Sequence, residues 1–170
     1  FSLIIEAFNL AETYQTPVLF LTDIILAMRM ESVDIPDLNA IEIKNRLIFQ
    51  SNGAPGLESG YLRYDLTAEN GVSPISIPGM EGGQYTATGL EHNESSRPRY
   101  DPKTHSRMTE KRFHKLKTAM GDAPPAVRHG DPDAETGIIT WGSTTGVVIE
   151  AIDRLQDKGL ALDMIAPRML

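Results

Sequence analysis

The middle of the chain carries a long polar segment that has almost nothing apolar to bury. It runs from Tyr85 to Lys117 and passes from a loop into a basic helix. A segment without a core of its own has to be ordered by other surfaces, and ordered polar loops often carry binding and chemistry. We therefore interpret it first as a contact surface. Its candidate site residues are Glu91, His92, Asn93, Glu94, Arg97 and Arg99.

The N-terminal stretch has the pattern of half an α/β unit. Apolar residues recur at helical spacing between Leu3 and Tyr14, which predicts an amphipathic helix over residues 2–15. Pro17 ends this helix, and residues 18–21 form a short continuous apolar run. Runs of this kind are typical of a buried parallel strand.

The next part of the chain lacks a sustained hydrophobic period. A short helix is expected over residues 23–29, whereas Gly and Pro residues interrupt residues 33–59 and favour extended or irregular chain there. A strand is expected over residues 61–64, with a turn at Glu69-Asn70-Gly71 after it.

A basic helix is predicted over residues 104–120. A solvated face, or a face turned toward a partner, explains its charge. Nucleic-acid binding is the other interpretation, but it calls for stacking aromatics beyond Phe113, and the rest of the chain is acidic. The narrow apolar stripe of this helix consists of Met108, Phe113, Leu116 and Met120, and its basic residues are Arg107, Lys111, Arg112, Lys115 and Lys117.

Residues 121–135 have the composition of a linker, with two Gly, three Pro and four acidic residues. A domain boundary is expected there, between residues 1–120 and residues 136–170. In the second part, strands over 138–141 and 160–165 flank an amphipathic helix that Gly159 ends. A connection of this length implies parallel pairing with a right-handed crossover.

Two features invite a ligand-binding interpretation. The turn Gly142-Ser-Thr-Thr-Gly146 could bind phosphate through its backbone amides, but it has no P-loop Lys and is not GxGxxG. A close strand-to-helix turn with Ser143 as N-cap is favoured. The four histidines have neither HxxxH nor HExxH spacing, so no metal site is predicted, and no GxSxG motif nominates a nucleophile.

Composition limits the compartment and the partners. The chain has no Cys, so it can neither form disulfides nor ligate an iron–sulfur cluster in the usual way. Its net charge of −7 argues against nucleic acid as the main partner. No apolar run approaches the roughly 20 residues that span a bilayer, and the start does not resemble a signal peptide. A soluble cytoplasmic protein is expected, and the two ends predict an internal fragment of a longer subunit.

Several motifs together resemble a known family. GLEHNESSRPRYDP (89–102), HSRMTEKRFHKL (105–116) and RYDLTAENGVSPISIPG (63–79) are similar to the alpha subunit of 2-oxoacid:ferredoxin oxidoreductases, in particular the 2-oxoglutarate (KorA-like) branch. AFNLAETYQTPVLFLTD (7–23) resembles the end of its pyrimidine-binding thiamine domain. TWGSTTGVVIEAIDRLQDKG (140–159) resembles the start of its transketolase-C-like domain.

This resemblance implies an α/β fold. Residues 1–120 would be the C-terminal part of a thiamine pyrimidine-binding-type domain with an irregular polar segment and a basic helix. Residues 121–135 would be a linker, and residues 136–170 the first βαβ unit of a truncated transketolase-C-like domain.

The implied activity is oxidative decarboxylation of 2-oxoglutarate to succinyl-CoA, with ferredoxin as the electron acceptor. The complex would use thiamine diphosphate, Mg²⁺ and a [4Fe-4S] cluster, with coenzyme A as co-substrate and most ligands on a beta subunit. The segment alone would carry no catalytic residue. Pyruvate or a branched-chain 2-oxoacid is an alternative substrate, and a transketolase-type thiamine enzyme or a non-catalytic interaction module is an alternative protein class.

The resemblance also suggests a role for the polar loop. We expect it to lie against the beta subunit near the mouth of the 2-oxoacid site, with Glu91 and His92 ordering the interface and Arg97 or Arg99 pairing with carboxylates. The family commonly has Asp where this chain has Asn93, so a carboxylate role is not expected at that position. His92 is a residue type that titrates near physiological pH, so it could tune substrate affinity.

Overall fold

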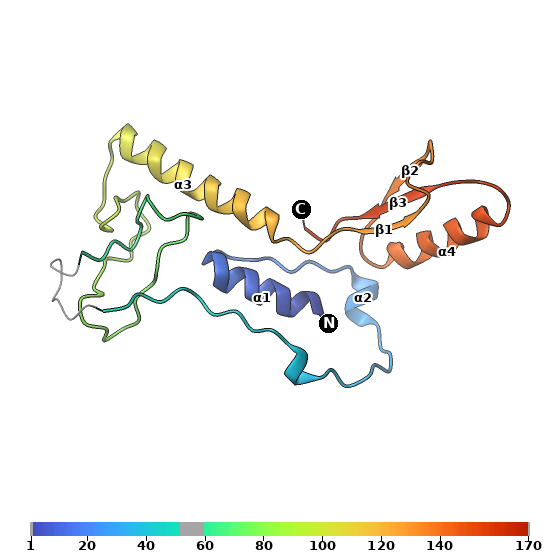
Figure 1. The fold of residues 1–170 in the computed structure, drawn as a ribbon, viewed down its shortest axis with the longest axis horizontal. Helices are drawn as coiled ribbons and strands as arrows, with labels where there is room; N and C mark the ends of the chain where they lie inside the picture. The colour runs from blue at the N-terminus through green and yellow to red at the C-terminus, as the bar shows by residue number, and fades with distance from the viewer. Residues whose placement is uncertain (1, 52–59, 170) are drawn as a thin grey trace. The chain divides into compact units, whose positions relative to one another are not determined.

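The computed structural model describes residues 2–51 and 60–169. The chain divides into two units (Figure 1). The first combines the N-terminal stretch up to Val18 with the chain from Glu42 to Asp122. The second combines Leu19–Ile41 with the chain from Ala123 onward. The predicted division at residues 121–135 stays a prediction, although the change of unit after Asp122 falls within that range.

In the first unit, helix α1 (Ser2–Tyr14) packs against helix α3 (Pro102–Gly121). Tyr14 is buried with Val72 and Ala119, and its hydroxyl donates a hydrogen bond of 2.6 Å to Asp122 Oδ2. Burial, followed by the contact with Asp122, raises the pKa of Tyr14 to about 12. The helix predicted over residues 2–15 is confirmed, and its apolar face is what holds it to α3.

Helix α3 is confirmed as well, and it begins two residues before the predicted start. Asp101 caps it by accepting a hydrogen bond of 2.9 Å from the backbone N–H of Thr104, and Pro102 occupies the first turn, where no amide partner is needed. Of the predicted apolar stripe only Met108 is buried. The other members, Phe113, Leu116 and Met120, are exposed.

Two predicted strands are wrong. Residues 18–21 form no strand and are exposed, because no described strand lies beside them to complete the hydrogen-bonding ladder that a buried strand needs. Residues 61 and 62 have no regular structure and residues 63 and 64 form a turn, so no strand lies there. There the backbone N–H of Tyr64 donates to the carbonyl oxygen of Glu94, so the polar loop takes the place of a sheet partner.

The expected irregular course of residues 33–59 is confirmed for residues 33–51. This part is extended apart from a short 3-10 helix, η1 (Leu38–Ala40), and an isolated parallel bridge joins Ile48 to Ile75. Residues 52–59 lie outside the described chain.

The second unit contains a three-stranded mixed sheet with the order β1-β3-β2 and helix α4 (Thr144–Gln156) against it (Figure 1). Strand β2 (Gly137–Ile139) runs parallel to β3 (Asp163–Ala166), which confirms the predicted parallel strand–helix–strand unit and the α/β class. Ile152 of α4 is fully buried against Met164 of β3, whose side chain has no exposed surface. Gly159, at φ +80°, follows the helix as predicted.

The third strand was not foreseen. Strand β1 (Val127–Gly130) lies inside residues 121–135, the stretch with the composition of a linker, and pairs antiparallel with β3. Arg128 supports the pairing, because its guanidinium donates to the Asp163 carboxylate at 2.9 Å. Antiparallel pairing with an established strand needs only four residues here, too few to produce a recognisable hydrophobic period.

Helix α2 (Ile24–Met28) confirms the short helix expected over residues 23–29. Asp23 caps it through Oδ1, which accepts from Leu26 N at 2.9 Å. Its other oxygen, Oδ2, accepts a hydrogen bond of 2.6 Å from the backbone N–H of Ser143 at the start of α4. One carboxylate therefore joins two helix N-termini of the second unit.

Candidate functional site

The loop at the centre of the sequence is closed by its own hydrogen bonds. The backbone N–H of Asn93 donates to the carbonyl of Arg97 at 2.9 Å, and the side-chain oxygen of Asn93 accepts from the backbone N–H of Arg97 at 2.9 Å. Ser96, at φ +64° and only 1% exposed, turns the chain and accepts a bond from the N–H of Thr86. The Asn93 side chain closes the loop by accepting a hydrogen bond through its amide oxygen. A carboxylate oxygen of Asp could accept the same bond, so closing the loop does not require a negative charge at this position.

Glu91 fastens this loop to α3. Its carboxylate accepts from Arg112 Nη2 at 2.7 Å and lies 2.8 Å from His105 Nδ1, and its side chain is 20% exposed. The bonds from Arg112, supported by His105, lower the pKa of Glu91 to about 2. The carboxylate is therefore ionised over the physiological range and serves as a fixed anchor instead of a proton donor.

His92 is buried beside Glu91. Its ring stacks on Tyr64, with ring centroids 3.8 Å apart and planes at 29°, and its Nδ1 lies 3.2 Å from the carbonyl oxygen of Asn93. The side chain is 9% exposed. This packing makes His92 part of the loop's support, and a direct role in tuning substrate affinity stays a prediction.

The remaining predicted site residues fall into two groups. Glu94 faces inward, where Oε1 accepts from the backbone N–H of Leu66 at 3.1 Å. Arg97 and Arg99 are exposed, and neither takes part in an ion pair within the described chain. The structure thus brings Glu91, His92, Asn93 and Glu94 into one ordered loop and leaves the two arginines on its outer surface.

A cavity of about 140 Å³ adjoins this loop, and most of its polar lining was not foreseen. His92 and Arg112 line it from the side already described, and Arg63, Lys111 and Lys115 add three further cations. Lys111 and Lys115 follow Met108 at helical spacing, so the face of α3 that carries buried Met108 also carries both lysines. This spacing was visible in the sequence, but only the burial of Met108 shows that the face turns inward.

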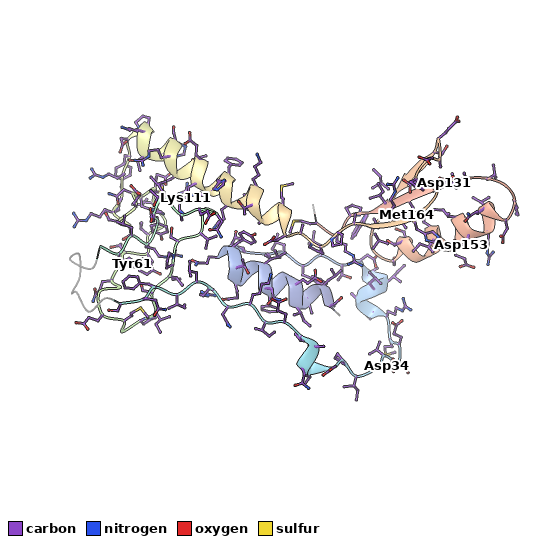
Figure 2. All side chains as sticks on the ribbon, viewed as in Figure 1. Asp34, Tyr61, Lys111, Asp131, Asp153 and Met164 are labelled. Carbon is purple, nitrogen blue, oxygen red and sulfur yellow. The ribbon has the colours of Figure 1, made fainter. Side chains whose placement is uncertain are left out.

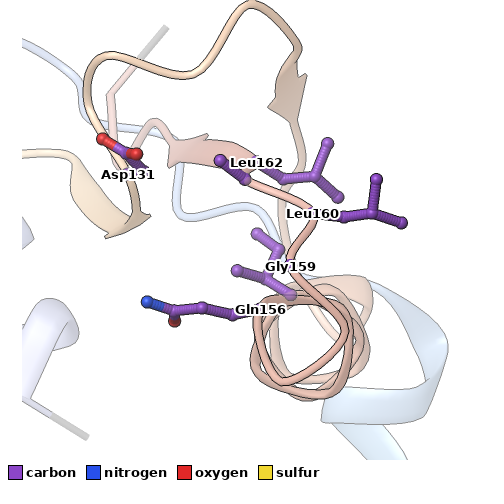
Figure 3. A pocket seen from close by; sticks show the side chains of 7 residues that line it. Asp131, Gln156, Gly159, Leu160 and Leu162 are labelled. Atoms are coloured by element: carbon purple, nitrogen blue, oxygen red, sulfur yellow. The ribbon is translucent and has the colours of Figure 1, made fainter.

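The second unit has a cavity of about 160 Å³ between β1, the end of α4 and the approach to β3 (Figure 3). Asp131 and Gln156 supply the polar side chains of its lining, and Gly159, Leu160 and Leu162 also line it. A single carboxylate and a single amide do not make a catalytic pair.

The Gly142–Gly146 turn does not offer a free phosphate site in the structure. The Ser143 amide that would point at a phosphate already donates to the Asp23 carboxylate. Ser143 occupies the N-cap position, as favoured from the sequence, but its side chain makes no capping bond. An intramolecular carboxylate has taken the place that an external anion would need.

Among the described residues there is no group of three or more His, Cys, Asp or Glu side chains that could hold a metal ion. Within the same part of the chain, no helix has the length and apolarity needed to cross a membrane. What this segment offers is an ordered, charged loop held to a helix beside a cationic cavity.

Comparison with known proteins identifies the family of the chain. Residues 1–111 match the family model described as pyruvate flavodoxin/ferredoxin oxidoreductase, thiamine diphosphate-binding. The chain belongs to this family, as a segment of a 2-oxoacid:ferredoxin oxidoreductase alpha subunit.

Individual relatives extend the match over nearly the whole chain. The alpha subunit of 2-oxoacid:ferredoxin oxidoreductase 2 from Aeropyrum pernix is 34% identical over 98% of this chain and 25% of its own length. The 2-oxoglutarate oxidoreductase subunit KorA from Mycobacterium tuberculosis is 34% identical over 94% of this chain and 23% of its own. The chain thus spans about a quarter of the length of these curated relatives.

A solved structure supports the fold. The 2-oxoglutarate:ferredoxin oxidoreductase from Magnetococcus marinus, with 2-oxoglutarate, coenzyme A and succinyl-CoA bound, matches with a TM-score of 0.86 and 39% identity. The match covers 95% of this chain and 27% of that one.

The family model is described as thiamine diphosphate-binding, which raises the question of whether the described residues fit that cofactor. A thiamine diphosphate site needs oxygen ligands that hold Mg²⁺ against the diphosphate. The described residues contain no group of three or more His, Cys, Asp or Glu side chains for this purpose, and the Ser143 amide of the Gly142–Gly146 turn already donates to Asp23. A carboxylate-built Mg²⁺–diphosphate site therefore does not fit the described residues.

Proposed function

We propose that this chain is part of the alpha subunit of an enzyme complex that oxidatively decarboxylates 2-oxoglutarate to succinyl-CoA and reduces ferredoxin. The observation that carries the proposal is the 39% identity, over 95% of this chain, to a structure whose bound molecules are 2-oxoglutarate, coenzyme A and succinyl-CoA. The KorA relatives, whose names specify 2-oxoglutarate, point to the same substrate.

The cofactors of the proposed complex are thiamine diphosphate, Mg²⁺ and a [4Fe-4S] cluster, with coenzyme A as the acyl acceptor. The thiamine cofactor supplies the carbanion chemistry of such a reaction. Because this chain has no Cys, the cluster ligands must come from another polypeptide or another part of the complex, and a beta subunit is the proposed carrier. The proposed location is the cytoplasm.

Within that complex, the role proposed for this segment is to shape the wall of the substrate side. The loop from Glu91 to Arg99 is ordered internally and anchored to α3, and it presents Arg97 and Arg99 outward. Exposed guanidinium groups on an ordered loop are suited to pair with carboxylates of a beta subunit. The segment carries no catalytic residue of its own in this proposal.

A different 2-oxoacid is the second candidate substrate. Several relatives are named only for 2-oxoacids, without a specific substrate, so pyruvate and branched-chain 2-oxoacids are kept as alternatives. Family membership favours an oxidoreductase subunit over a transketolase-type thiamine enzyme or a non-catalytic interaction module.

The substrate test uses the complete complex. Viologen reduction with coenzyme A is measured for 2-oxoglutarate, pyruvate and 2-oxoisovalerate, and the highest kcat/KM is expected for 2-oxoglutarate. A higher kcat/KM for either of the others would refute the substrate assignment. Residues 1–170 alone should give no activity, and unaided viologen reduction by this segment would refute the proposed division of labour.

The role of the loop is tested separately by His92→Ala in the complete complex. Loss of the ring that stacks on Tyr64 should loosen the loop and raise the KM for 2-oxoglutarate or weaken assembly with the beta subunit. His114→Ala, an exposed histidine on α3, is the matched control. Unchanged assembly and unchanged KM in the His92 variant would make the loop ordinary surface.

A further inference from the structure

Three cationic side chains converge in the first unit, and none of them forms an ion pair with a carboxylate of the described chain. Arg63 comes from the loop segment, and Lys111 and Lys115 come from α3; all three line the cavity of about 140 Å³. Figure 2 labels Lys111 on α3. One water molecule needs only ~10–15 Å³ measured in this way, so the cavity has room for a small polyatomic ligand.

The lysines are held by uncharged oxygens. Lys111 Nζ donates to the carbonyl oxygen of Gly71 at 2.7 Å and to Ser73 Oγ at 3.0 Å, and Lys115 Nζ donates to the carbonyl oxygen of Gln15 at 3.2 Å. Carbonyl and hydroxyl groups are dipoles and leave the net charge in place. None of the ion pairs between described residues includes either lysine or Arg63.

Arg63 is held in the same way and keeps one donor unused. Its Nη2 donates to Gln15 Oε1 at 2.7 Å and its Nη1 to the carbonyl oxygen of Ser73 at 3.3 Å. Its Cζ lies 5.2 Å from the centroid of the Tyr64 ring and 5.7 Å from that of Tyr85, which fixes the guanidinium. The Nε of Arg63 is buried beyond the reach of water and has no partner among the described residues. Arg63 is itself part of the cavity lining, so the positive charge of its guanidinium acts on whatever the cavity holds.

The charges are also forced close together. Lys111 and Lys115 are one helical turn apart, and the loop approaches α3 so closely that a Cβ on Gly71 would lie 2.9 Å from Lys115 Cβ. Burial, and then the charge of Lys115, lowers the pKa of Lys111 to about 8. Burial is also the main reason why the pKa of Lys115 is lowered. The negative charges of Asp65 and Glu94 raise the pKa of Lys111, but neither carboxylate forms an ion pair with it.

We propose that this cavity binds a phosphate-class oxyanion. The cavity lining contains these three positive charges and no carboxylate, so a ligand with more than one negative charge would balance them better than a single carboxylate. Phosphate meets this requirement, because it carries up to two negative charges near neutral pH. Its several oxygens can accept from donors that arrive from different directions, here the guanidinium of Arg63 and the two ammonium groups. The ligand is either free inorganic phosphate or the phosphoryl group of a larger molecule. This binding does not depend on which 2-oxoacid the complex oxidises.

The test is calorimetric titration of inorganic phosphate into the complete protein, at constant ionic strength held with chloride. Saturable binding is expected. Lys111→Met should raise the Kd roughly tenfold or more, since a charge-assisted hydrogen bond is lost. Lys117→Met, at an exposed position on the same helix, should leave the Kd unchanged, and Lys111→Arg should retain most of the binding. Absence of saturable binding, or equal weakening in the Lys111→Met and Lys117→Met variants, would overturn the proposal.

Two further measurements complete the design. Circular dichroism checks that Lys111→Met is folded, and if it is not, Lys115→Met is titrated in its place and must also weaken phosphate binding. Competition by adenosine monophosphate identifies the source of the anion. Displacement of phosphate supports a phosphoryl group on a larger ligand, and failure to displace it supports free phosphate.

Discussion

The anchor between the polar loop and α3 makes a quantitative prediction for Glu91→Gln. Gln keeps the shape and some hydrogen bonding but loses the charge that Arg112 and His105 contact. The pKa of Glu91 lies at about 2, against an ordinary value of 4.5. At 1.36 kcal/mol per pKa unit this corresponds to at most about 3 kcal/mol. Since Arg112 is half exposed, solvent screens the pair, and we expect a loss of about 1–2 kcal/mol at pH 7.

The same reasoning gives the pH dependence of this loss of stability. A carboxyl group whose pKa is lowered by folding stabilises the folded state above its unfolded pKa, and this stabilisation is lost as the pH falls toward the folded pKa. The difference in free energy of unfolding between wild type and Glu91→Gln should therefore be full at pH 7 and shrink between about pH 4.5 and pH 2.

Urea denaturation of both proteins at several pH values measures this difference. Glu110→Gln, an exposed glutamate on α3, is the matched control and should change the free energy of unfolding by less than about 0.5 kcal/mol. An equal loss in the Glu91 and Glu110 variants at pH 7, or a difference that does not shrink in acid, would refute the role of Glu91 as an ionised anchor.

Three further predictions follow from packing and backbone geometry. Tyr14→Phe removes the hydrogen bond to Asp122 and should lower the free energy of unfolding by about 1 kcal/mol in urea, whereas Tyr100→Phe, at an 80% exposed residue, should be neutral. Gly142→Ala would bring a Cβ into a clash with Asp23 Oδ2 at a residue with φ +64°, so it should lower the Tm, while Gly146→Ala within α4 meets open space and should not. Met164→Ala should cost about 2–5 kcal/mol because Met164 is completely buried, and Met30→Ala, at 95% exposure, is its control; equal effects of the two would contradict the assigned core.

Local sequence was sufficient to predict a segment's secondary structure where that structure depends on the periodicity of the segment's own apolar residues. Helix α1, helix α3 and the parallel strand–helix–strand unit were predicted, because their apolar residues recur at the period of the element they form. Residues 18–21 have the composition of a buried strand and are exposed, since a strand is completed only by a neighbour. Strand β1 shows the converse, because four residues with little pattern become a strand when β3 lies beside them.

The sequence by itself determined the family, the main helices, the identity of the polar loop and the absence of thiol chemistry, since these depend on residue type and spacing alone. Only the tertiary structure decided what the polar groups do. It shows that Glu91 is an anchor paired with Arg112, that Asp23 occupies the turn before α4, and that Arg63 meets Lys111 and Lys115 around one cavity. Arg63 and Lys111 are far apart in sequence, and the energy of an ionisable group is set by burial and by neighbours that the fold alone brings close.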